Sequence, residues 1–73
     1  MIEKQFGKVL KKLRTAKGIS QESFALNIGL HRTYISQLER GLKSPSLRTI
    51  DKICAELGIT MVQMMQYLDQ EQR

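Results

Sequence analysis

The sequence QESFALNIGLHRTYISQLER, at residues 21–40, determines the architecture of this 73-residue chain. On either side of Gly29, its apolar residues recur at the three- and four-residue spacing of one helix face. Glycine enters the left-handed conformation at little cost, which makes Gly29 the natural end of the first helix. Ala25 is small, so the next helix can cross close above it. The stretch therefore predicts a helix over about 21–28, a tight turn, and a second helix over about 32–40.

An amphipathic helix is predicted on each side of this stretch. The upstream helix covers about residues 2–16 and ends before Gly18. Its inner face holds Ile2, Phe6, Val9, Leu10 and Leu13. The downstream helix is capped by the hydroxyl of Ser46 and ends at Gly58. Its inner face holds Leu47, Ile50, Ile53, Cys54 and Leu57, and the thiol of Cys54 is expected to behave as a small buried hydrophobic group.

A fifth helix is predicted over about residues 60–70, because Thr60 and Gln63 have the spacing of a capping box. One side of this helix is lined by Met61, Met64, Met65 and Leu68. With Val62 and Tyr67 added, the helix offers more apolar surface than the terminal helix of so small a domain buries alone. We therefore expect a contact between two copies of the chain here rather than core packing alone. Residues 69–73 are expected to fray.

The whole chain, residues 1–73, is predicted to be one all-α domain, a compact bundle of five short helices. A hydrophobic content of 41% argues against disorder, and no apolar run approaches the roughly 18 residues of a membrane span. One cysteine cannot form an internal disulfide, and the start MIEKQFGKVL is unlike a secretion signal. A cytoplasmic location is the expectation. So small a core also favours an oligomer or a bound partner.

The net charge of +5 points weakly to a polyanionic partner. Residues 1–19 carry this excess, since they contain six Lys or Arg and one acid. Nothing in the chain has the spacing of a catalytic site, a phosphate-binding glycine loop or a metal cluster. The sequence therefore predicts no enzyme activity, no cofactor and no metal. The lone His31 is interpreted as a turn residue rather than a ligand.

The two short helices and their glycine turn form a helix-turn-helix arrangement. Three segments carry a family resemblance: RTAKGISQESFA at 14–25, HRTYISQLERG at 31–41 and SPSLRTIDKICAELGI at 44–59. With them, the chain resembles the Xre/Cro/CI family of phage and bacterial repressors over roughly residues 6–68. The run GLHRTYISQLERG and the small size are most similar to the controller proteins of restriction–modification systems.

The resemblance implies a homodimeric transcriptional regulator that binds double-stranded DNA. Its two reading helices would enter successive major grooves of a roughly palindromic site, about 34 Å apart. The residues implied to read bases are Arg32, Thr33, Ser36 and Gln37. Those implied to contact the DNA backbone are Gln21, Arg40, Lys43, Ser44 and Ser46. Arg14 and Glu39 match a family ion pair that orients the reading helix.

Several alternatives stay open from the sequence. A module of the same fold can act chiefly by holding a partner protein, as an antitoxin does. RNA binding is disfavoured by an aromatic content of 5%. The basic upstream helix has the pattern of a membrane-surface helix, and the polar face of the third helix has that of a solvated surface. Tyr34 is compatible with packing beside the motif or with contact to a nucleic-acid backbone.

Overall fold

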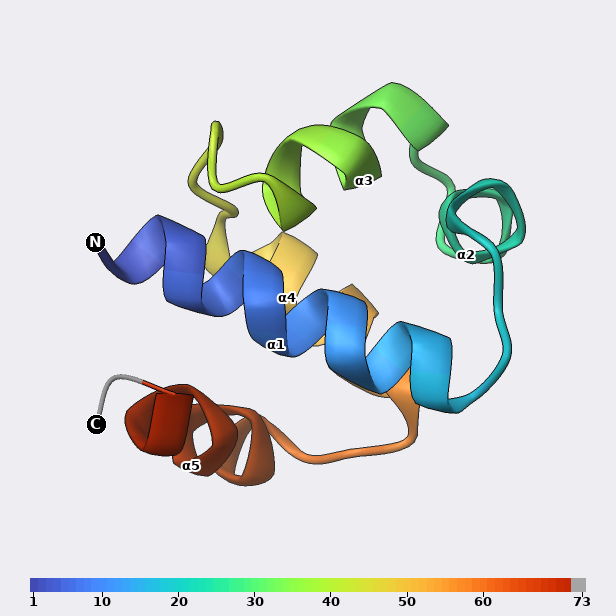
Figure 1. Cartoon of the computed structure of the whole chain (residues 1–73). Coiled ribbons are helices and arrows are strands. Elements are labelled where there is room, and N and C mark those ends of the chain that lie inside the picture. Colours follow the sequence, from blue (N-terminus) through green and yellow to red (C-terminus); the bar gives the residue numbers. More distant parts are fainter. Residues whose placement is uncertain (72–73) are drawn as a thin grey trace.

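The computed structural model describes residues 1–71, which form five α-helices and no strand (Figure 1). The helices are α1 (Ile2–Ala16), α2 (Gln21–Asn27), α3 (Arg32–Glu39), α4 (Leu47–Leu57) and α5 (Met61–Glu71). The all-α bundle predicted from the sequence is confirmed, and the predicted ends of the first four helices differ by at most one residue from those observed.

The helices begin and end at capping residues and glycines that can be recognised in the sequence. The Ser20 hydroxyl accepts a hydrogen bond from the Ser23 backbone N–H at 3.0 Å and so caps α2. Thr60 and Gln63 cap α5 reciprocally, with backbone-to-side-chain distances of 2.9 and 3.0 Å. Gly29 has a φ of +72°, the left-handed conformation that ends one helix and turns the chain toward the next.

The helix α1 crosses the molecule with α3 on one side and α5 on the other (Figure 1). The helix α2 packs on α3, and α4 packs on α5. The largest fully buried side chains come from all five helices: Phe24, Leu10, Ile35, Leu38, Ile53, Leu57, Met64 and Cys54. One core therefore holds the buried face of α3, and the opposite face of this helix points outward.

The closest approach between α1 and α3 occurs at Gly7. A Cβ on Gly7 would lie 2.5 Å from the backbone oxygens of both Leu38 and Glu39. No side chain fits there without moving one of the two backbones. Glycine at this position thus sets the depth at which α3 lies on α1.

Two residues assigned to inner helix faces are exposed instead. Ile2 keeps 54% of its surface and Leu47 keeps 75%. Each is the first residue of its helix, where the chain has not yet reached the core, so the predicted burial was wrong at both. Both line a hollow between α1, α4 and α5.

The predicted fraying of the C-terminal segment was wrong for residues 69–71. The helix α5 continues to Glu71, whose carboxylate Oε1 lies 2.7 Å from Lys12 Nζ on α1. This hydrogen bond lowers the pKa of the Glu71 carboxyl, and the charge of Lys8 acts in the same direction. Residues 72 and 73, also in the predicted segment, lie outside the described residues.

Candidate nucleic-acid interface

The helix α3 presents a polar face away from the core. Ile35 and Leu38 are fully buried and hold the opposite face. At about 100° per residue, the four residues predicted to read bases share an arc of about 140° on the outer side. Arg32 and Thr33 are exposed, and Ser36 and Gln37 are half-buried. The helix therefore offers a row of hydrogen-bonding side chains that project from a rigid support.

Four of the five residues predicted to contact a DNA backbone lie in or next to the segment that follows α3, and the fifth, Gln21, begins α2. Arg40 is exposed directly after the helix, and Lys43 and Ser44 are exposed in the segment that follows. Ser46 lies at the end of that segment, where its hydroxyl accepts a hydrogen bond from the backbone N–H of Thr49 at 3.1 Å. Ser46 thus has a capping role in α4 whatever else it binds.

A buried ionic network fixes the orientation of α3. Arg14 Nε donates to Glu39 Oε2 at 2.6 Å, and Arg14 Nη2 donates to Glu39 Oε1 at 3.0 Å. Arg14 Nη1 also donates to the backbone oxygen of Ile19 at 2.7 Å. The two charged side chains are 8% and 3% exposed. Such a bidentate pair holds direction as well as distance, and it is costly to break once buried.

Gln21 joins the same network from α2. Its amide Nε2 donates to Glu39 Oε1 at 2.9 Å. One carboxylate therefore connects α1, α2 and α3. The remaining amide hydrogen and the backbone N–H at the start of α2 stay available to donate to a phosphate. The phosphate contact of Gln21 stays a prediction.

The structure also shows the surroundings of His31, Tyr34 and Cys54, none of which was assigned a DNA contact from the sequence. His31 is exposed at the N-terminus of α3 and makes no capping hydrogen bond. Tyr34 packs half-buried against the edge of the core. Cys54 is 2% exposed, as predicted, and burial raises the pKa of its thiol, with a further contribution from Asp51. Within residues 1–71, no three His, Cys, Asp or Glu side chains are placed to hold a metal ion.

The surface of α5 differs from the interface predicted for it. Met64 is fully buried and Leu68 is 7% exposed, so neither offers appreciable surface to a second copy. The prediction was wrong for these two residues because their side chains complete the core of the same chain. Met61 is half-buried, and Met65 is 41% exposed.

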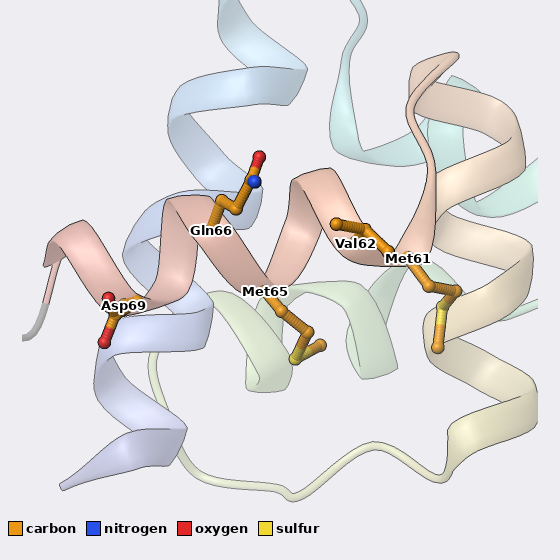
Figure 2. A pocket seen from close by; sticks show the side chains of 5 residues that line it. All are labelled: Met61, Val62, Met65, Gln66 and Asp69. Carbon is orange, nitrogen blue, oxygen red and sulfur yellow. The ribbon is translucent and has the colours of Figure 1, made fainter.

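The exposed apolar side chains of α5 are Val62, Met65 and Tyr67. In Figure 2, Met61 and Met65 extend to one side of the helix along a shallow hollow. Met65 also lines the hollow between α1, α4 and α5, together with Ile2 and Leu47. An apolar surface thus runs from α5 across to the starts of α1 and α4. We call Ile2, Leu47, Met61, Val62 and Met65 the α5 apolar surface.

Comparison with known proteins identifies the family of the chain. Residues 10–63 match the helix-turn-helix family. The chain belongs to that family. It is 46% identical over 71 residues to the control protein C.MunI from a Mycoplasma species, and the match covers 96% of each chain. The family resemblance predicted from the sequence is confirmed.

Two solved structures of helix-turn-helix controller proteins superpose on the chain. The restriction–modification controller C.AhdI from Aeromonas hydrophila has a TM-score of 0.81 at 42% identity, covering 85% of this chain and 94% of its own. The controller C.Esp1396I has a TM-score of 0.88 at 31% identity, covering 97% and 93%. That protein was solved as a tetramer in complex with its natural 35 base-pair operator.

Two features of the helix-turn-helix support were missed in the sequence. Gly7 carried a signal, because a glycine inside a helix costs roughly 1 kcal/mol relative to alanine and usually has a packing reason. The hydrogen bond from Gln21 to Glu39 carried no such signal, since 18 residues separate the two in the sequence.

No helix within residues 1–71 is both long and apolar enough to span a membrane.

Proposed function

We propose that this protein is a sequence-specific regulator of transcription that binds double-stranded DNA as a homodimer, and that it controls a restriction–modification system. The observation that carries the proposal is the polar outer face of α3, held from below by a buried ionic network. The near full-length similarity to a control protein supports the finer assignment.

In this proposal, α3 enters the major groove with its N-terminal part toward the bases. The planar guanidinium of Arg32 donates two hydrogen bonds to O6 and N7 of a guanine. Thr33 offers a hydroxyl or a methyl group, and Ser36 and Gln37 reach neighbouring bases. Gln21, Arg40 and the segment after α3 bind phosphates, which sets the register of the protein on the duplex.

The α5 apolar surface joins two copies of the chain in this proposal. Val62 and Leu47 are 66% and 75% exposed, which leaves large side chains in water unless a second copy covers them. The similar controller C.Esp1396I is a tetramer on its operator, which supports an oligomer. A two-fold dimer would present its two α3 helices to successive major grooves, about 34 Å apart.

Regulation follows from occupancy of a promoter. A dimer that overlaps the polymerase site represses transcription, and one bound just upstream can activate it. A regulator of this kind acts where the DNA is, in the cytoplasm predicted from the sequence.

Selection from a pool of random duplexes, repeated at two salt concentrations, tests the proposal. We expect one roughly palindromic consensus and an affinity that falls steeply with salt, because released counterions drive phosphate binding. The variant Arg32→Ala/Gln37→Ala serves as the matched control and should lose the consensus while it retains weak, salt-dependent binding. If the natural protein selects no consensus, the proposal is overturned in favour of a protein-interaction module.

A further inference from the structure

A stripe of lysines runs along the outer face of α1. Lys4, Lys8 and Lys11 are all exposed and lie within about 60° of one another around the helix. The opposite face, with Phe6 and Val9, is buried in the core. We call Lys4, Lys8 and Lys11 the lysine stripe.

The lysines of the stripe form no ion pair within residues 1–71, although the charge of Lys8 acts on the Glu71 carboxylate. Glu3 is the only acid in α1. Like charges three or four residues apart destabilise a helix by a few tenths of a kcal/mol per pair. Lys12, next to the stripe, is by contrast bound to Glu71. Packing and helix formation therefore do not explain the stripe.

The charged side chains of α4, which are exposed except for the half-buried Glu56, have a different pattern. They alternate in sign along the helix, from Arg48 to Asp51 and from Lys52 to Glu56. Each pair has the three- or four-residue spacing at which opposite charges attract. A solvated helix face needs only this pattern, which α1 lacks.

The stripe begins beside the residues proposed to bind the DNA backbone. A Cβ on Gly41 would lie 2.9 Å from the Cα of Lys4, so the chain leaving α3 touches the first turn of α1 (Figure 1). Arg40 and Lys43 flank Gly41 in the chain. From there the stripe continues for roughly 10 Å along α1, a length over which a duplex carries about six phosphates.

We infer that the lysine stripe is a second DNA-backbone surface, which binds the duplex just outside the bases contacted by α3. The inference rests on the proposed function. The duplex that leaves Arg40 and Lys43 curves toward α1, and the stripe neutralises its phosphates. This contact adds affinity without sequence preference and favours operators whose flanks bend easily.

The test compares K8Q/K11Q with K17Q/K52Q, which removes the same charge from exposed lysines off the stripe. Binding is measured as a function of salt on two duplexes, the selected consensus alone and the consensus with about one helical turn added on each side. On the longer duplex, K8Q/K11Q should reduce the slope of log affinity against log salt by about 2, since each lost phosphate contact removes about 0.9. The control variant should leave that slope close to the natural one.

On the short duplex, K8Q/K11Q should match the control. Equal slopes for the two variants on the longer duplex would overturn the inference and leave the stripe to an acidic protein partner. A reduced slope on both duplexes would place the lysines inside the operator and would also overturn it. Loss of the consensus by the natural protein would instead remove the proposed function.

Discussion

The helices α3 and α5 are both amphipathic, but their exposed sides differ in chemistry. Each helix buries two side chains, Ile35 and Leu38 in α3 and Met64 and Leu68 in α5. The outer face of α3 is polar and is oriented by a buried ion pair. The helix α5 instead exposes the apolar side chains of Val62 and Met65, and its end is bound to α1 by the solvent-facing Lys12–Glu71 contact. The first face suits base edges, and the second suits another apolar surface.

The largest expected effect comes from breaking the buried Arg14–Glu39 ion pair that orients α3. Glu39→Ala leaves the buried guanidinium of Arg14 without its partner and should lower the free energy of unfolding by about 3–5 kcal/mol. Chemical denaturation measures this loss. The control Glu22→Ala removes an exposed carboxylate from α2 and should change stability by less than about 0.5 kcal/mol. A small loss for Glu39→Ala would mean that the network does not hold α3.

The second-largest effect is expected from disrupting the proposed dimer contact at α5. Met65→Asp places a charge in the α5 apolar surface, so we expect monomers and a fall in operator affinity of about 10²–10⁴-fold, the gain usual for linked sites. Sedimentation and operator titration measure the two effects. Leu26→Asp is the control, because Leu26 is 78% exposed on α2, away from this surface. An intact dimer of the Met65 variant would move the interface elsewhere.

The reading role of α3 has a smaller expected effect per residue. Arg32→Ala should cost about 1–3 kcal/mol of binding free energy and relax the preference at one base pair. The fold should be unchanged, because Arg32 is exposed and outside the core. Repeating the random-duplex selection measures the preference. An unchanged consensus would contradict the role assigned to Arg32.

The smallest expected effect is at Gln21, which belongs both to the ionic network through Glu39 and to the proposed phosphate contact. Gln21→Ala should weaken binding to all sequences alike by about 1 kcal/mol, the order of one hydrogen bond. Gln21→Glu would set a second carboxylate against Glu39 and should be worse in both stability and binding. A loss confined to one base pair for Gln21→Ala would argue for base reading instead.

Local rules predicted most of the fold. Caps such as Ser20 and Ser46, and left-handed glycines such as Gly29 and Gly58, act within one turn of the chain, so their partners are visible in the sequence. Periodicity found the buried faces but failed at Ile2 and Leu47, since the pattern does not say where a helix first reaches the core.

The surfaces were harder to predict than the elements. The exposed face of α3 follows from its buried face. On α5, methionines occur on both sides, and a sequence pattern cannot distinguish Met64 in the core from Met65 in solvent. The network through Glu39 joins residues that only the tertiary fold brings together.

The most direct measurement of the central claim is the affinity of the natural dimer for the selected palindrome with altered half-site spacing. If α5 joins two copies so that their α3 helices lie one DNA turn apart, binding depends on that spacing. Inserting about five base pairs turns one half-site to the opposite face of the duplex, and affinity should then fall to that of a single half-site. Unchanged affinity after the insertion would contradict the claim that a rigid dimer reads both half-sites together.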